Sequence, residues 1–124
     1  MKSVGWGVVG CSDIVERRAG DAIRSQPDSR IVAFHSRRLD RARAFAERYG
    51  ALAAYDDLER LLADDRVDVV YVATEADRHA ESAIAAARAG KHVLVEKPMA
   101  LDVDQCRAMI AAAEECGVHL EVAY

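Results

Sequence analysis

The feature that most restricts the fold of this chain is a repeated unit: a short valine-rich run, a turn, and a longer helix-period stretch that ends at a glycine. Apolar runs of this length that alternate with helical segments are typical of a parallel sheet whose faces are covered by helices. The runs are Val4–Val9, Arg30–His35, Val67–Ala73, His92–Glu96 and Val118–Ala123, with a weaker one at Ala51–Tyr55. The sequence therefore predicts an α/β fold with six strands.

Three stretches between the runs carry apolar residues at the spacing of one buried helix face. These stripes are Leu39, Ala42, Ala46 and Tyr49; Ala80, Ala83, Ile84 and Ala87; and Val103, Cys106, Ile110 and Ala113. Capping residues mark the helix ends, because free backbone groups there need partners. Asp56 with Glu59 and Asp102 with Gln105 have capping-box spacing, and Gly50, Gly90 and Gly117 follow helices.

The order of these elements leaves few possible topologies, because strand-helix-strand connections are right-handed. The arrangement it favours is a doubly wound parallel six-stranded sheet, the Rossmann fold, as a single domain over residues 1–124. No low-complexity segment or linker divides the chain. Ligands of such folds bind beyond the carboxyl ends of the strands, so we expect the chemistry there.

Composition excludes several classes of protein. Hydrophobic residues make up 52%, charged residues 31%, and the net charge is −4, which argues against disorder and against nonspecific nucleic-acid binding. The widely spaced Cys11, Cys106 and Cys116 form no C-x-x-C pair and have no histidine at zinc-ligand distance, so we expect reduced thiols and no metal site. No stretch has the length of a signal peptide or of a membrane span. We expect a cytoplasmic protein without a membrane or nucleic-acid partner.

The letters Gly5-Trp6-Gly7-Val8-Val9-Gly10 match the dinucleotide fingerprint G-x-G-x-x-G. That motif binds phosphate only where it follows a strand and opens a helix. Here it lies inside the first apolar run, and we reject it as the phosphate loop.

The register that fits the fold starts at Gly10 and continues through Cys11, Ser12, Asp13 and Ile14. It is a degraded fingerprint in which only the first glycine remains. A helix that begins near Ser12 would point unpaired amides at an anion, and the Ser12 hydroxyl can donate to a phosphate oxygen or cap the helix. The alternative is an ordinary strand-to-helix turn.

At the end of the second run, Ser36, Arg37 and Arg38 occupy the place where a fold that prefers NAD has a carboxylate for the ribose hydroxyls. The planar guanidinium of Arg37 suits a 2′-phosphate. We therefore expect NADP in preference to NAD. The alternative is that Ser36 caps the next helix and the arginines coat its solvent face.

The run from Ala89 to Pro98, Ala-Gly-Lys-His-Val-Leu-Val-Glu-Lys-Pro, resembles a signature of the Gfo/Idh/MocA oxidoreductases. Further features match the pattern of this family, in the same order, over essentially the whole chain. They are Trp6 to Ile14, Ser36-Arg37 with the Arg/Ala-rich stretch after it, Tyr55 to Leu62, Val67 to Thr74, and His79.

The resemblance implies an NAD(P)-dependent enzyme that moves a hydride between nicotinamide and a carbon bearing a hydroxyl or carbonyl, on a sugar or cyclitol. By that likeness Lys97 would assist proton transfer beside the nicotinamide, and Glu96 would bond the cofactor or orient the lysine. Pro98 would fix the turn, and a cis peptide is one way to do so. The alternative is that Glu96 and Lys97 form a solvated ion pair.

The loop after Thr74 departs from the family pattern, which has Pro-Asn where this chain has Glu75-Ala76. By resemblance Thr74, Glu75 and His79 would border the nicotinamide ribose. A structural role for His79 competes with a functional one.

Members of the family carry a second domain that completes the substrate site, and no such domain is encoded in these residues. We therefore expect residues 1–124 to bind the cofactor without catalysing the reaction. They would act on a small polyhydroxylated substrate only together with that domain. A stand-alone sensor or regulatory module that binds NAD(P) is the alternative. Apolar surface left exposed would favour a homo-oligomer.

Overall fold

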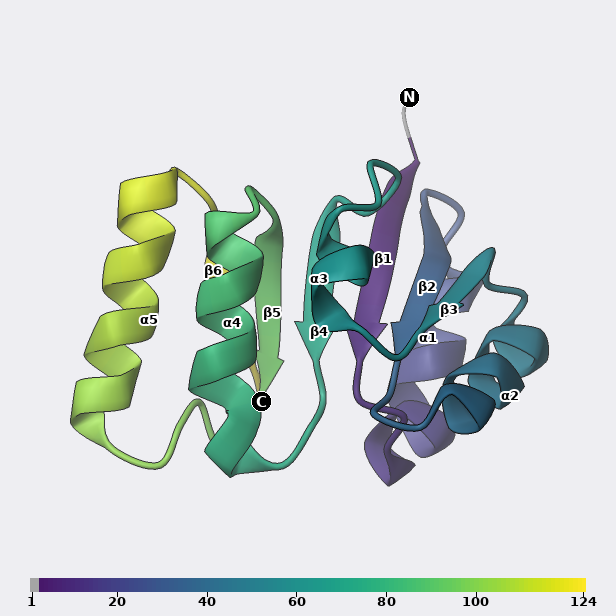
Figure 1. The fold of residues 1–124 in the computed structure, drawn as a ribbon, viewed down its shortest axis with the longest axis horizontal. Coiled ribbons are helices and arrows are strands. Elements are labelled where there is room, and N and C mark those ends of the chain that lie inside the picture. The colour runs from purple at the N-terminus through teal and green to yellow at the C-terminus, as the bar shows by residue number, and fades with distance from the viewer. Residues whose placement is uncertain (1–2) are drawn as a thin grey trace.

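A computed structural model describes residues 3–124 as a six-stranded, all-parallel sheet with helices on both faces (Figure 1). The strands lie in the order β3-β2-β1-β4-β5-β6, the doubly wound order of the Rossmann fold. They are β1 (Val4–Val9), β2 (Ser29–His35), β3 (Ala53–Tyr55), β4 (Val69–Val72), β5 (His92–Glu96) and β6 (Leu120–Ala123). The predicted fold class and all the predicted strands are thus confirmed.

Some strands begin later than the apolar runs that predicted them. The amide of Val67 donates to Asp64 O at 3.1 Å, and that of Val118 donates to Ala113 O at 3.0 Å. These residues bond back to the preceding turn, so the sheet ladder starts after them.

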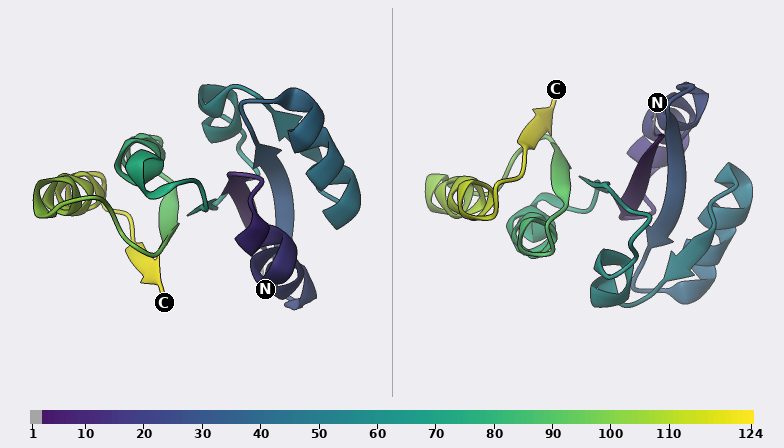
Figure 2. Two further views of the ribbon diagram at one scale, coloured as in Figure 1. Left: turned by 90° about the horizontal axis from the view of Figure 1, so that it is seen from below. Right: turned by 90° about the horizontal axis from the view of Figure 1, so that it is seen from above.

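Helices cover the two faces of the sheet in two groups. The helices are α1 (Gly20–Ser25), α2 (Leu39–Tyr49), α3 (Leu58–Leu62), α4 (His79–Arg88) and α5 (Val103–Cys116), with a π-helical turn at Val15–Ala19 and a 3-10 turn at Ala76–Arg78. Residues of α1 and α2 pack in one buried cluster, and residues of α3, α4 and α5 pack in the other. Figure 2 shows α4 and α5 side by side.

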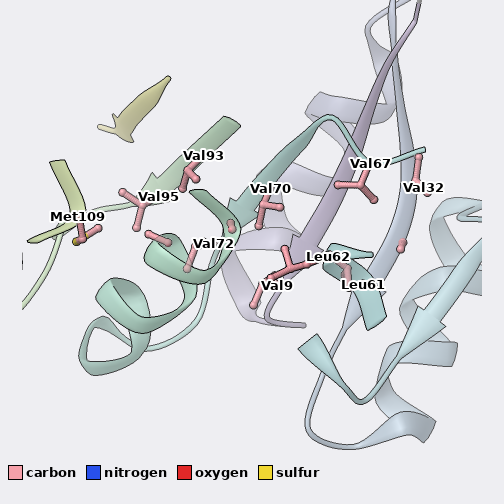
Figure 3. Close-up of a cluster of buried hydrophobic side chains, with 13 residues drawn as sticks. Val9, Val32, Leu61, Leu62, Val67, Val70, Val72, Val93, Val95 and Met109 are labelled. Carbon is pink, nitrogen blue, oxygen red and sulfur yellow. The ribbon is translucent and has the colours of Figure 1, made fainter. Parts of the chain in front are cut away.

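The strands supply most of the core. Figure 3 shows the cluster on the α3–α5 face, where strand valines meet the leucines of α3 and Met109 of α5. On the other face Phe34 packs against Phe45 and Tyr49, with ring centroids 5.6 and 5.7 Å away. Burying one such side chain contributes about 1.5–3 kcal/mol, so the sheet centre is the most stable part of the domain.

The predicted buried stripe of α5 is wrong in part. Val103 is 63% exposed and Ile110 is 45% exposed, whereas Met109, Ala112 and Ala113 are buried. Helix α5 packs against α4 at the end of the sheet, so only the side that carries Met109 towards the cluster on the α3–α5 face is covered. The stripes of α2 and α4 are confirmed, because Ala42, Ala46 and Tyr49 and also Ala83 and Ala87 are buried.

The capping residue of α3 also differs from the prediction. Asp57, not Asp56, is the N-cap, and its Oδ1 accepts from the Glu59 amide at 3.0 Å. The extended backbone of Asp57 places its carboxylate against that amide, so the cap lies one residue closer to Glu59 than the sequence indicated. Asp102 caps α5 as predicted, with Gln105 N 2.8 Å from its Oδ1. Gly50, Gly90 and Gly117 follow helices as predicted, and each has a positive φ.

The rejected glycine motif lies inside β1, as expected. A Cβ at Gly5 would stand 2.0 Å from the carbonyl oxygen of Arg66, and one at Gly7 would stand 2.9 Å from a methyl of Leu61. These glycines therefore let the segment from α3 to β4 lie close against the first strand.

Candidate functional site

A cavity of about 820 Å³ opens at the carboxyl ends of β1, β2 and β4. Strand β1 lies between β2 and β4. The connections that follow β1 and β4 run over opposite faces of the sheet, so a crevice forms between the ends of these strands. Predicted site residues that line the cavity are Gly10, Cys11, Ser12, Asp13, Ile14, Ser36, Arg37, Arg38, Thr74 and Glu75. His79, Glu96 and Lys97 are not among the lining residues.

Gly10 ends β1 in a conformation that requires glycine. Its φ is +108°, and a Cβ there would lie 2.8 Å from the carbonyl carbon of Ala73. The loop can therefore turn tightly at the floor of the cavity beside the end of β4.

Ser12 carries an unsatisfied polar atom at this floor. Its Oγ is fully buried and has no hydrogen-bond partner among the described residues. The chain enters a helix directly after it, because the Glu16 amide donates to Ser12 O at 3.1 Å, and a π-helical turn follows at Val15–Ala19. A buried hydroxyl beside the first amides of a helix fits the oxygen of a bound phosphate.

Cys11 contributes backbone rather than a reactive thiol. Burial raises the pKa of this thiol to about 11, with the nearby Arg41 charge acting in the opposite direction. Its Sγ lies 3.7 Å from His35 O, and it packs in the cluster on the α1–α2 face. The side chain therefore stays protonated at neutral pH.

Arg37 and Arg38 follow the end of β2. Within residues 3–124 Arg37 forms no ion pair, while Arg38 pairs with Asp40 at 2.9 Å on the surface. Ser36 Oγ accepts from the Arg38 amide at 3.2 Å, and Arg38 is the N-cap of α2, so Ser36 does not cap that helix.

Arg41 is the residue that sequence reasoning missed. Its Nε donates to Cys11 O at 2.8 Å, and its guanidinium carbon lies 5.3 Å from the centroid of the Phe45 ring. It lines the cavity and joins α2 to the glycine loop. Its place in the first turn of the helix after β2, four residues beyond Arg37, was the available signal.

His79 is a buried connector between two loops. It is 1% exposed; its Nδ1 lies 2.8 Å from Pro98 O and its Nε2 lies 2.9 Å from Thr74 O. The ring therefore ties the loop after β4 to the turn after β5. The neighbouring Glu75 is exposed at the cavity, and its carboxylate has no ion-pair partner in the described part of the chain.

The turn after β5 holds Glu96, Lys97 and Pro98. The Lys97–Pro98 peptide is cis. Glu96 Oε2 accepts from the Tyr71 hydroxyl at 2.9 Å, and Lys97 is exposed. The described residues include no ion pair between Glu96 and Lys97, so the alternative of a solvated pair is not what the structure shows.

A tight glycine turn, a buried unpartnered hydroxyl and an arginine-rich second strand end meet at the switch point of a doubly wound sheet. These features together define a dinucleotide-binding domain of the Rossmann class.

No helix within residues 3–124 combines the length and apolarity that crossing a membrane requires.

Comparison with known proteins gives the family. A profile described as an oxidoreductase family with an NAD-binding Rossmann fold, the Gfo/Idh/MocA family, matches residues 4–124. The chain belongs to this family, and it forms the nicotinamide dinucleotide-binding part.

Individual relatives agree with this assignment. The chain is 46% identical over 114 residues to a dTDP-3,4-didehydro-2,6-dideoxy-alpha-D-glucose 3-reductase of Actinomadura kijaniata, covering 92% of this chain and 34% of the relative. It is 36% identical over 115 residues to a scyllo-inositol 2-dehydrogenase (NADP(+)) of Bacillus subtilis, covering 93% and 35%. The chain thus spans about a third of the length of these relatives.

A solved structure shows the same fold. The crystal structure of a 3-ketoreductase from Actinomadura kijaniata in complex with NADP and TDP-benzene superposes with a TM-score of 0.91 at 43% identity, covering 97% of this chain and 37% of that one.

Proposed function

We propose that residues 1–124 form the cofactor domain of an NADP-preferring oxidoreductase that acts on a hydroxyl or carbonyl carbon of a sugar-like or cyclitol-like substrate. The observation that carries this proposal is the cavity at the switch point, where the unpartnered Ser12 hydroxyl and the arginines after β2 line one space. The reductase and dehydrogenase relatives support the reaction class.

The floor of the cavity would hold the diphosphate. Gly10 keeps the loop flat against the end of β4, Ser12 supplies a donor, and the amides of Cys11, Asp13 and Ile14 belong to the loop that opens the helix. Anions are stabilised at such a position by the helix dipole and by amides without intrahelical partners.

The 2′-phosphate would lie between Arg37 and Arg41. The Arg41 side chain is held by Cys11 O and by the Phe45 ring, so it loses little conformational freedom on binding. Ser36 adds a hydroxyl, Arg38 adds charge, and the strand end bears no carboxylate that would favour the ribose hydroxyls of NAD.

Reaction chemistry would centre on Lys97 at the turn after β5. The nicotinamide supplies or accepts the hydride. In the reducing direction Lys97 Nζ would donate a proton to the substrate oxygen as the carbonyl carbon is reduced, which leaves an alcohol. Thr74 and Glu75 would border the nicotinamide ribose, and His79 holds their loop to the turn that carries the lysine.

Residues 1–124 would bind cofactor without completing a substrate site. The cavity is lined by strand ends, loops and helix residues of this domain, and Lys97, which is not among them, is exposed. Hydride transfer needs donor and acceptor held together with water excluded, so turnover would require further walls.

Titration with NADPH and with NADH tests the proposal. NADPH should bind more tightly, because a phosphate paired with guanidinium groups gains charge-assisted hydrogen bonds. Replacing Arg37 by alanine should remove most of that preference, and replacing Arg41 by alanine should reduce it. Equal affinities of the wild-type domain for the two nucleotides would remove the 2′-phosphate assignment.

Arg43→Ala is the matched control. Arg43 is an exposed arginine of the same helix and does not line the cavity. Its removal changes the net charge as much as Arg37→Ala does, and it should leave the NADPH preference intact.

Location and assembly are further parts of the proposal. Free Cys11, Cys106 and Cys116 support a reducing, cytoplasmic compartment. Exposed apolar side chains before and along α5, those of Leu101, Val103 and Ile110, support self-association, which sedimentation at high protein concentration would test. A clean monomer under those conditions would contradict it.

A further inference from the structure

A buried tyrosine is bonded to the glutamate that ends β5. The Tyr71 hydroxyl lies 2.9 Å from Glu96 Oε2, and Tyr71 is only 3% exposed. Tyr71 on β4 is opposite Leu94 on β5, and Glu96 follows Leu94 by two residues, so Tyr71 and Glu96 lie diagonally on the same face of the sheet. The glutamate side chain is therefore held from the neighbouring strand.

The direction of this hydrogen bond is determined by the tyrosine. Burial raises the pKa of the Tyr71 hydroxyl well above its ordinary value, and the bond to Glu96 raises it further. The hydroxyl keeps its proton throughout the neutral range, so Tyr71 donates and the glutamate oxygen accepts. An ionised carboxylate has acceptor sites only.

The second oxygen of Glu96 has no donor from the described part of the chain. Only Oε2 takes part in a hydrogen bond there, and the adjacent Lys97 forms no ion pair with the carboxylate. Glu96 is half-buried at the carboxyl end of the strand, next to the turn that His79 ties to Thr74. One oxygen is thus anchored, and the other remains an acceptor at the edge where ligands of this fold bind.

We infer that Tyr71 is a positioning residue for the cofactor, an inference that rests on the function proposed above. Its hydroxyl holds the Glu96 carboxylate in one orientation, so that Oε1 accepts a hydrogen bond from a hydroxyl or amide of the nicotinamide nucleoside half. The adenosine half of the cofactor, at the ends of β1 and β2, would not sense this bond.

Two ligands separate a positioning role from a structural one. NADPH contains both halves of the cofactor, whereas adenosine 2′,5′-bisphosphate contains only the adenosine half with the 2′-phosphate. Calorimetric titration of the whole chain should show that Tyr71→Phe weakens NADPH about five- to tenfold, the effect of one hydrogen bond. Its affinity for the bisphosphate should stay within about twofold of the wild type.

A double-mutant cycle tests whether Tyr71 acts through Glu96. Glu96→Gln keeps the shape of the side chain but replaces one acceptor oxygen by a donor group, so it should weaken NADPH and spare the bisphosphate in the same way. The double variant should bind NADPH no more weakly than Glu96→Gln alone, because the two residues share one interaction. Additive losses would overturn the inference.

Tyr55→Phe is the matched control. The Tyr55 hydroxyl also donates to a carboxylate, that of Asp64 at 2.9 Å, but Asp64 lies in the turn before β4 begins, whereas Glu96 lies at the carboxyl end of β5. Its loss should lower the melting temperature without changing the affinity for either ligand. Unchanged NADPH binding in Tyr71→Phe, or equal weakening of both ligands, refutes the positioning role. Failure of the wild-type domain to bind either ligand would refute the proposed function itself and this inference with it.

Discussion

Replacing Ser12 by alanine should stabilise the cofactor-free domain and weaken cofactor binding at the same time. The Ser12 Oγ is buried at the floor of the cavity with no hydrogen-bond partner in residues 3–124. A buried hydroxyl without a hydrogen-bond partner destabilises the free domain. It stabilises the complex only when a bound cofactor supplies an acceptor. Opposite signs of the two effects are characteristic of a residue retained for binding.

The structure allows the magnitudes to be worked out. Leaving a buried hydroxyl without a partner costs about 1–3 kcal/mol, so its removal, less some lost packing, should raise the free energy of unfolding by about 1 kcal/mol. For a domain of this size that corresponds to an increase of about 4 °C in melting temperature. A hydrogen bond to a charged phosphate contributes about 1.5–3 kcal/mol, so the affinity for NADPH should fall about 10- to 150-fold.

Urea unfolding of the free domain and calorimetric titration with NADPH measure the two effects. Ser25→Ala is the control, because the Ser25 hydroxyl is exposed and already donates to Ala22 O at 3.0 Å. That variant should change neither the affinity nor, beyond about 0.5 kcal/mol, the stability. A Ser12→Ala domain that is less stable than the wild type, or that binds NADPH equally well, would refute the reasoning.

Three further predictions concern stability and reactivity. Gly5→Ala should destabilise the fold by more than about 3 kcal/mol in urea unfolding, since the new Cβ would overlap the Arg66 carbonyl; a loss near 1 kcal/mol would contradict the close approach. Hydrogen bonds from Arg66 hold the pKa of Asp64 well below its ordinary value. The stability that this carboxylate contributes is therefore present above about pH 4 and is lost as the pH falls towards the lowered pKa. In an acid titration, the Asp64→Asn variant should not show this part of the decrease in stability. With its pKa raised to about 11, Cys11 should alkylate at pH 8 far more slowly than the exposed Cys116, as peptide mass spectrometry would show.

The strand pattern could be predicted from the sequence because parallel strands are buried on both faces. Runs such as Val4–Val9 and His92–Glu96 are continuous in apolar character, and their bounds agree with the observed strands. The tight turn at Gly10 and the arginines after β2 were also predictable, since the carboxyl ends of strands follow directly from the strand assignment.

Which face of a helix is buried depended on its neighbours. The stripe of α5 matched helical periodicity, yet Val103 and Ile110 are exposed, and Met109 packs in the core instead. Periodicity predicts that a helix has an apolar face. Which of its residues are buried depends on how the helix packs against the sheet and the adjacent helices. An edge helix meets less of that surface, so its apolar residues are a weaker guide.

By itself the sequence determined the order of strands and helices, the glycine turn and the position of the charged residues at strand ends, because these depend on short-range spacing. Only the tertiary structure decided which distant groups meet: Tyr71 with Glu96, Arg41 with Cys11, and His79 with Pro98. These contacts join residues 19 to 30 positions apart in the chain, across neighbouring strands and their loops. Their partners are set by sheet register and by the packing of helices against it, which no local pattern encodes.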